Sequence, residues 1–385
     1  MHPRLLLALI GGVLLSASLR SPSLHAQGCV APVRQGASAV GGQGSPYLEP
    51  GAWRFNFNYR YFKSDRHLVG SREDRERSRE HSEVINRVHL LDFGLSHAIT
   101  RRIVASADLP VLIATRSSPV RNSRNELVDR DLSRAEGIGD MVIQGASWIL
   151  DPEEYLKGNV ALSLGVKLPT GDDDVRHRAT VRSGNTLVRQ ERTVDQSITP
   201  GDGSFGAVLG LQGFYTLFER FTLFTQGSYL FNPRNTNGVP TFRTTSGEEV
   251  LSVADAYLAR VGVATPIPFL EQYGFGASCA GRIEGVPVRD AIGSSDGFRR
   301  PGYSVAIEPG ISWGWRTHTF SLSAPIAIYR NRQRSVPDDE ATPQRHGDAA
   351  FADYSIIFNY SVDFGGPSPH AMEMPSDLLE PEASH

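Results

Sequence analysis

The stretch WRFNFNYRYF, residues 53–62, alternates between aromatic and polar side chains over its first nine positions. In a β-strand, successive side chains point to opposite faces of the sheet. One face of this strand is therefore aromatic, and the other is polar and charged. An aromatic face packs in a soluble core about as readily as it faces lipid, so the rest of the chain has to decide between these environments.

The first residues of the chain indicate export. A short basic segment, MHPR, precedes the apolar run LLLALIGGVLLSASL, and Ala26 ends a segment typical of a cleavage site. After residue 26 there is no run of about 18 apolar residues, which a membrane helix would need. The mature protein is therefore expected to be either a soluble exported protein or a β-barrel.

Composition bears on the class of partner and on whether the cysteines are paired, free or lipidated. The net charge of −3 over 385 residues argues against nucleic acid as a partner. The two cysteines, Cys29 and Cys279, could pair in an oxidising compartment, but two free thiols are favoured. A lipoprotein would have Leu three residues before Cys29, where Ala26 stands, and lipidation of Cys29 stays open.

Between residues 51 and 364 we expect about twelve strands, each close to the ten residues that a tilted membrane strand needs. Their connections alternate between long and short, as in outer-membrane barrels with short periplasmic turns and long extracellular loops. Soluble sandwiches have no reason to alternate in this way. The predicted fold is therefore all-β, a single transmembrane antiparallel up-and-down barrel, with strands at 52–63, 83–97, 102–115, 138–150, 158–169, 204–217, 220–232, 252–265, 272–286, 302–315, 318–330 and 349–364.

The chain then divides into four parts. Residues 1–26 are a signal peptide, and residues 27–50 are a flexible periplasmic segment rich in Gly, Ser and Pro. Residues 51–364 form the barrel, and residues 365–385 form a disordered acidic periplasmic tail. Two long loops carry further expectations: 64–83 forms a short exposed helix, and 170–196 folds into the pore or forms a hairpin of its own.

The alternation assigns the side chains to two faces. Aromatic residues near strand ends are expected to form a lipid-facing girdle, namely Trp53, Tyr59, Tyr61, Trp313, Trp315, Tyr360 and Phe364. Charged residues of the other parity are expected to line the lumen, as a pore or as a salt-bridge network, namely Arg54, Arg60, Asp92, Asp108, Asp140, Lys167, Arg260, Arg282, Glu284, Glu308, Asp353 and Asp363.

Two interpretations of these charges stay open. Opposite charges could pair with one another and close the lumen, or they could line a narrow path for a polar solute. Arg260, Arg282 and Glu308 share the polar parity of consecutive strands, so we expect them to lie close together inside the barrel. Hydrated charges would tune ion selectivity, whereas desolvated partners would depend on each other for stability.

The sequence contains little that favours catalysis or metal binding. A membrane phospholipase places a His and a Ser one residue apart on a strand, and the sequence holds no His-x-Ser. His67, His81, His177 and His346 fall in loops, and His89 lies beside Arg87 near the outer rim, where lipopolysaccharide phosphates are plausible partners. The carboxylates at 172–174 suit Ca²⁺, but a solvated loop is favoured. No cofactor or metal is predicted.

Two motifs carry a family resemblance. GIGDMVIQGASWIL (137–150) and VALSLGVKLPTGDDD (160–174) resemble the outer-membrane barrels of the "meta-pathway of phenol degradation" family, which are regarded as transporters. The matching positions are Gly137, Gly139 and Asp140, followed by residues 167–171 (KLPTG). The last strand, 350–364, also resembles the closing strand of that family. The resemblance implies a barrel that forms a pore, and it transfers no binding residues.

The sequence thus predicts a non-enzymatic barrel in the bacterial outer membrane, exported by a cleaved signal peptide. Its predicted function is passive passage or uptake of a small solute, hydrophobic or aromatic by resemblance. The alternatives are a structural or adhesive barrel with a plugged lumen and a membrane-embedded hydrolase. The expected partners are outer-membrane lipid, lipopolysaccharide, the barrel assembly machinery and the solute.

Overall fold

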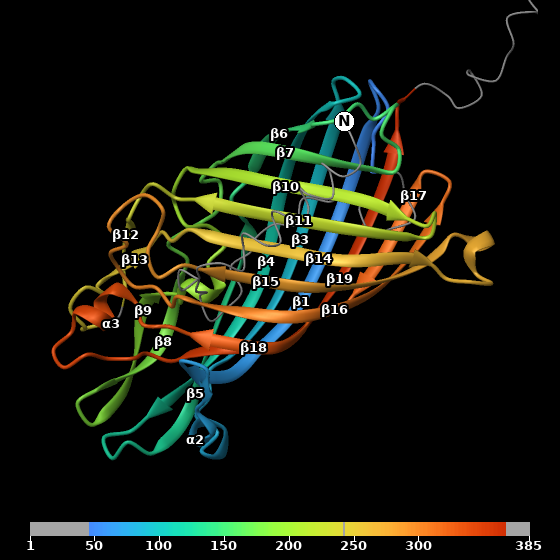
Figure 1. Ribbon diagram of the computed structural model, residues 1–385. Coiled ribbons are helices and arrows are strands. Elements are labelled where there is room, and N and C mark those ends of the chain that lie inside the picture. Colours follow the sequence, from blue (N-terminus) through green and yellow to red (C-terminus); the bar gives the residue numbers. More distant parts are fainter. Residues whose placement is uncertain (1–45, 242, 367–385) are drawn as a thin grey trace, which may run out of the picture.

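The computed structural model describes residues 46–241 and 243–366, and it forms a closed antiparallel barrel of 12 strands (Figure 1), which confirms the predicted fold class. Strands that are consecutive in the chain are neighbours in the wall, and the last strand pairs with the first to close it. The wall strands are β1 (Trp53–Val69), β3 (Ile85–Ala98), β4 (Ile103–Arg121), β5 with β6 (Leu127–Ile138, Val142–Trp148), β7 (Gly158–Lys167), β10 (Gly206–Leu217), β11 (Phe221–Phe231), β14 (Ala256–Pro266), β15 (Phe275–Val286), β16 (Gly302–Trp315), β17 with β18 (His318–Ser323, Ile326–Arg332) and β19 (Ala349–Phe364).

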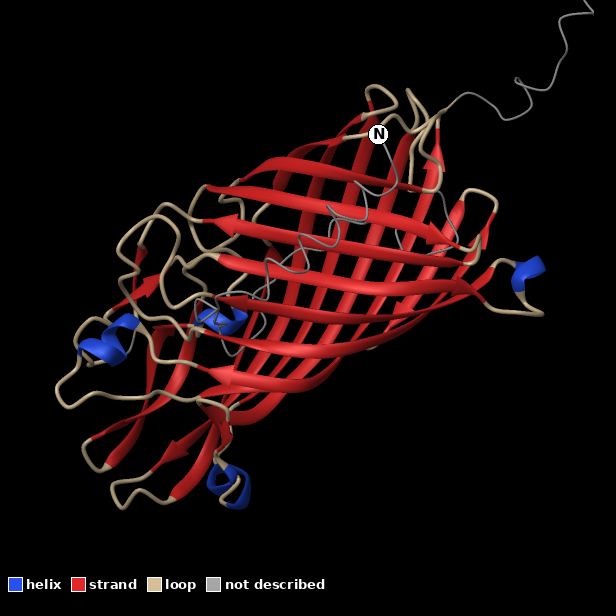
Figure 2. Cartoon of the chain, in the orientation of Figure 1, coloured by secondary structure: helices blue, strands red, loops and turns tan. Residues whose placement is uncertain are grey.

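The two ends of the barrel differ as expected. Short turns join the strands at the end where the described chain begins and ends, and long connections lie at the opposite end (Figures 1 and 2). Residues 64–83 hold the expected short helix, and part of 170–196 forms the expected hairpin. The smaller elements are β2 (Arg72–Glu73), α2 (Arg75–Arg79), β8 (Arg176–Ser183), β9 (Thr186–Thr193), η1 (Gln196–Ile198), β12 (Thr236–Pro240), β13 (Val250–Ser252), η2 (Glu271–Tyr273) and α3 (Val336–Glu340).

Some sequence expectations fall outside these residues. The predicted signal peptide, most of the lead-in segment, Cys29 and nearly all of the tail are not among the described residues. Cys279 is an exposed free thiol. No helix in the described part of the chain is long and apolar enough to cross a membrane.

The alternation in β1 has the predicted consequence. Arg54, Asn56, Asn58 and Arg60 are buried in the barrel interior, and the aromatic residues between them are more exposed. Each outward aromatic residue lies beside outward side chains of β3 and β19, because residues paired across strands share one face. The aromatic face of the opening stretch is therefore part of the outer surface of the barrel.

The predicted strand 138–150 is wrong in its bounds, because the fourth wall strand begins at Leu127 and is interrupted between β5 and β6. Its neighbour β4 pairs with β6 up to Asp108 and with β5 from Val111 onward. Pro110 lies at this change, and a proline has no N–H to donate to a ladder. The predicted loop 116–137 is consequently for the most part a β-hairpin that extends the wall outward.

Strict alternation along the predicted strand 318–330 would place Tyr329 on the inner face with Ser321 and Ser323, and this expectation is wrong. Val305 pairs with Tyr329, whereas the next residue, Ala306, pairs with Ala327, so β18 has one extra residue at Ile328. Such a bulge shifts the alternation of one strand by one position. Tyr329 is 43% exposed and its ring packs on that of Tyr303, on the outer face of the barrel.

Leu164 and Ser163 of β7 test the two faces directly. Leu164 is 63% exposed on the outer surface, and Ser163 lines the interior. Leu164→Arg should lower the free energy of unfolding by roughly 2–4 kcal/mol, because it places a charge near the middle of the apolar band. Ser163→Ala should change it little. Reversible urea unfolding in lipid bilayers measures both, and equal losses would contradict the assigned faces.

Candidate functional site

A chain of ion pairs crosses the barrel interior. Arg260 of β14 contacts Glu308 of β16 at 2.8 Å, and Glu308 contacts Arg282 of β15 at 3.3 Å. Arg282 contacts Glu284 at 2.6 Å, and Glu284 contacts Arg60 of β1 at 2.6 Å. In the wall, β16, the β17–β18 strand and β19 lie between β15 and β1, so the Arg60–Glu284 pair spans the lumen.

These charges are deeply buried and depend on one another. The side chains of Arg282 and Glu308 are each only 1% exposed, and Ser323 donates a further hydrogen bond to Glu308. Arg260 and Arg282 are direct cross-strand partners, so they would repel each other without the carboxylate of Glu308 between them. The three residues expected to lie close together do so, and they are paired rather than hydrated individually.

The remaining predicted lumen charges lie in four places, one of which is the Asp140–Lys167 pair. Arg54 and Asp363 form a bidentate ion pair near the end of the barrel with the short turns. Asp92 and Asp108 point inward from β3 and β4. Asp353 is 45% exposed at the long-loop end, where it pairs with Arg66 and Arg330.

The predicted girdle residues lie on the outer surface in two groups. Trp53 stacks on His97, and Trp313 stacks on Phe320 near the short turns. The group at this end is completed by Trp315, Tyr360 and Phe364. Tyr59 and Tyr61 lie further along β1, where both rings pack against His89.

Residues 194–205, the inward loop, connect β9 to β10 and fold into the lumen. Ile198 of η1 is fully buried against Phe62, Val88, Leu112 and other apolar side chains of β1, β3 and β4. These wall residues have the parity at which the sequence predicted polar lumen side chains. The interior of the barrel therefore contains an apolar region, and the inward loop packs against it.

Asp195 fixes one end of the inward loop. Its carboxylate accepts two hydrogen bonds from Arg300, at 2.7 and 2.5 Å, and lies 3.2 Å from Arg116 of β4. It also accepts a hydrogen bond from the N–H of Ser197 at the start of η1. Burial alone would raise the pKa of Asp195, but the charges of Arg116 and Arg300 hold that pKa well below its usual value.

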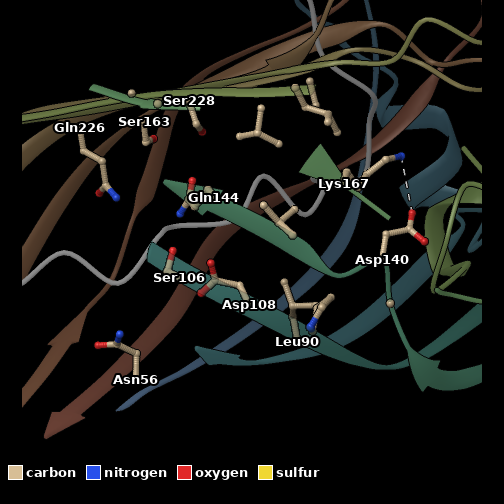
Figure 3. Close-up of a pocket in the computed structure, with 18 of the residues that line it drawn as sticks. Asn56, Leu90, Ser106, Asp108, Asp140, Gln144, Ser163, Lys167, Gln226 and Ser228 are labelled. Carbon is tan, nitrogen blue, oxygen red and sulfur yellow. Dashed lines mark ion pairs between the residues drawn. The ribbon is translucent and has the colours of Figure 1, made fainter. Parts of the chain in front are cut away.

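The two sequence motifs meet at the other end of the inward loop. Asp140 accepts hydrogen bonds from the N–H groups of Gly171 and Asp202, at 3.0 and 3.1 Å. Lys167 contacts Asp140, as Figure 3 shows, and it also contacts Asp202. A Cβ at Gly201 would lie 2.5 Å from the carbonyl oxygen of Gly171, so only glycine allows this approach. The motif residues thus hold the loop against the wall.

A cavity of about 310 Å³ occupies the lumen beside the inward loop. Side chains of most wall strands line it, together with Gln196, Ser197, Thr199, Pro200, Gly201 and Asp202 of the loop. Its polar lining includes Ser106, Asp108, Gln144, Gln226 and Ser228, which point into the same space in Figure 3. Its apolar lining includes Leu48, Leu90, Val104, Trp148, Leu230 and Val286. Charged side chains also line the cavity, namely Arg54, Arg60, Asp140, Lys167 and Asp202. The cavity surface therefore combines apolar, hydrogen-bonding and ion-paired side chains.

Loop histidines make contacts between loops. His67 contacts Asp348 through Nδ1 at 2.5 Å and accepts a hydrogen bond at Nε2 from the N–H of Val84, so both ring nitrogens are engaged. His177 contacts Asp131, and His346 contacts the carbonyl oxygen of Arg332. Within residues 46–241 and 243–366, no three His, Cys, Asp or Glu side chains are arranged to hold a metal ion.

Sequence reasoning missed the groups that define this site. It did not select Asp195, Arg300 or Asp202, because loop residues have no periodicity to place them. The inward apolar residues had a signal, since Phe62 and Leu90 interrupt the polar parity of their strands. That signal indicates a lumen that is partly filled by apolar contacts.

Comparisons with known proteins agree on the architecture. No family model matches this sequence, and no curated protein matches it. An outer-membrane channel from Pseudomonas putida F1 has a similar structure, with a TM-score of 0.55 and 12% identity, over 82% of this chain and 97% of that one.

Two further structures are less similar. The Ralstonia pickettii toluene transporter TbuX has a TM-score of 0.44 at 8% identity, over 86% of this chain and 96% of its own. The translocator domain of the autotransporter NalP from Neisseria meningitidis has a TM-score of 0.42 at 12% identity, over 82% of this chain and 89% of its own. The likeness to the Pseudomonas channel establishes a barrel fold of the outer-membrane type, and the family named from the two motifs stays a prediction.

Glu308→Gln should destabilise the barrel. The change leaves Arg260 and Arg282 buried without a full counter-charge, which costs about 3–5 kcal/mol of unfolding free energy. Glu271→Gln is the matched control, because Glu271 forms an exposed pair with Arg220 and its loss should cost about 1 kcal/mol or less. Equal small losses in denaturant unfolding would show that Glu308 is hydrated and not part of a desolvated network.

Asp195→Asn should release the inward loop. The neutral side chain keeps the hydrogen bond to Ser197 but loses the charge that holds Arg116 and Arg300 together. Amide hydrogen exchange over residues 196–202 should become faster, with the wall strands unchanged. In the unmodified protein the pKa of Asp195 is lowered, so its stabilising effect is complete above the ordinary Asp pKa and disappears only as the pH falls through the lowered value. Slow exchange in the variant would contradict this role.

Proposed function

We propose that the protein is an outer-membrane channel that admits a small, largely apolar solute through its lumen. The main observation in support of this proposal is the cavity in the lumen. Its volume of about 310 Å³ lies at the lower end of the range for small-molecule sites, and its lining mixes apolar side chains with a few hydrogen-bonding groups. Such a lining suits a solute with an apolar body and a polar substituent.

The position of the cavity supports passage rather than storage. Its lining extends from Leu48, close to the short-turn end, to Val286 at the outer end of β15. Three of the basic side chains that line it, Arg54, Arg60 and Lys167, are paired with carboxylates. The inward loop lines one side of the cavity, so a movement of that loop would widen the path.

The fold supports an outer-membrane location. The aromatic groups on the outer surface and the closed wall fit a lipid bilayer. The structurally similar protein from Pseudomonas putida F1 is itself an outer-membrane channel, which agrees with a pore function. The plugged barrel is the second candidate, because the ion-pair chain and the inward loop together occupy much of the lumen.

Ser228→Phe tests the cavity. Ser228 lines the cavity and its buried hydroxyl has no hydrogen-bond partner among the described residues, so a phenyl ring there should fill the path. Cells that produce the unmodified barrel should take up the apolar dye 1-N-phenylnaphthylamine faster than cells without it. The variant should reduce this uptake to the level of cells without the barrel.

Ala259→Phe is the control for that experiment. Ala259 is exposed on the outer face of β14 and pairs with Gly227, so the same ring there would point away from the lumen. Its uptake should equal that of the unmodified barrel. Uptake by the unmodified barrel no faster than by cells without it, together with no conductance in planar bilayers, would favour the plugged barrel.

A further inference from the structure

A row of basic side chains crosses four neighbouring wall strands on the outer surface. Lys63 of β1 pairs with Arg87 of β3, Arg87 pairs with Thr115 of β4, and Thr115 pairs with Arg134 of β5. Residues paired across strands share one face, and this face is the outer one, because Tyr61 lies two positions before Lys63. Lys63, Arg87 and Arg134 thus form a basic row on the outside of the barrel.

The basic row lies at the level of lipid headgroups. Along β1 the outward positions from Trp53 to Tyr61 are all aromatic, and the outward positions of β3 beside them are largely apolar or aromatic. At the usual rise and tilt of barrel strands, these positions cover roughly 20 Å along the membrane normal. Lys63 and Arg87 are the next outward pair toward the long loops. They therefore follow directly on the apolar band.

The cations of the row are accessible. Arg87 is exposed and has no hydrogen bond or ion pair within the described part of the chain. Lys63 contacts Asp65, and Arg134 contacts Glu136, through exposed side chains. Exposed pairs of this kind contribute little, so a phosphate can compete for both cations. The five groups together have one net positive charge.

Another sector of the rim has aromatic rather than charged side chains at its outward positions. At the outer ends of β11 and β14, Tyr229 pairs with Tyr257, and Tyr303 of β16 occupies a similar position opposite Gly285. The outward side chains of that sector are aromatic and uncharged, as is usual at the membrane–water interface. Below the basic row, His89 contacts the hydroxyl of Tyr59 at 2.8 Å and packs on the ring of Tyr61. The basic row thus stands over a flat aromatic surface.

We propose that the basic row binds the phosphate groups of lipid A, the phosphorylated glycolipid of the outer leaflet, with its acyl chains on the aromatic surface below. Arg and Lys side chains form strong charge-assisted hydrogen bonds with phosphate. The spacing of neighbouring strands, about 5 Å, brings cations from adjacent strands within reach of one headgroup. The inference rests on the outer-membrane location in the proposed function, and it is independent of solute passage.

The test uses the full barrel in detergent micelles, titrated with purified lipid A. The triple variant Lys63→Gln, Arg87→Gln, Arg134→Gln should bind lipid A about tenfold more weakly, or worse, because it loses the charged donors. The control variant Lys157→Gln, Arg220→Gln, Arg316→Gln removes the same charge from the short-turn rim and should bind as the unmodified barrel does. Dephosphorylated lipid A should bind all three proteins equally weakly.

Other outcomes decide against the proposal. Unchanged affinity of the triple variant, or equal affinity for dephosphorylated lipid A, overturns it, and displacement of lipid A by millimolar inorganic phosphate shows an anion site rather than a lipid site. The single variant Arg87→Gln carries the test if the triple variant does not fold, because Arg87 has no partner to lose within the described residues. Dye uptake by the triple variant should stay normal. Absent uptake by the unmodified barrel with intact lipid A binding removes only the channel function.

Discussion

The pairing of β1 with β19 is the constraint on which the rest of the structure depends. A bilayer offers no water to an unpaired N–H or C=O, so a sheet in lipid must close on itself. Closure fixes which face of every strand points into the lumen. The strand pairing that closes the barrel begins with Trp53 opposite Phe364. The paired charges, the inward loop and the cavity all lie in a space that exists only because the last strand returns to the first.

Most of the barrel wall could be predicted from the sequence, because apolar and polar side chains alternate wherever a strand is regular. Strand order, alternating connection lengths and the outward aromatic face of β1 were all predictable from that pattern. The pattern fails where the ladder is irregular. Pro110 interrupts the pairing of β4, and the extra residue at Ile328 reverses the face of Tyr329. Bulges depend on partner strands, which the local sequence does not contain.

The location of the charged residues of the candidate site could be predicted from the sequence, whereas its cavity could not. Arg260, Arg282 and Glu308 share a parity on consecutive strands, and that parity alone predicts that they lie together. Whether they pair or bind water depends on how much of the lumen is filled. The lumen is filled by the inward loop, whose position depends on Asp195, Arg300 and an apolar cluster with residues from four wall strands. Contacts between segments so distant in sequence have no local signature.

The Arg60–Glu284 contact has a mechanical consequence. Closure fixes the circumference of a barrel but not the outline of its cross-section, which can flatten toward an ellipse without breaking any ladder. A bond between β1 and β15 joins two walls that backbone pairing leaves free to move apart. The contact therefore braces the lumen, because it holds the wall at β15 at a fixed distance from the wall at β1.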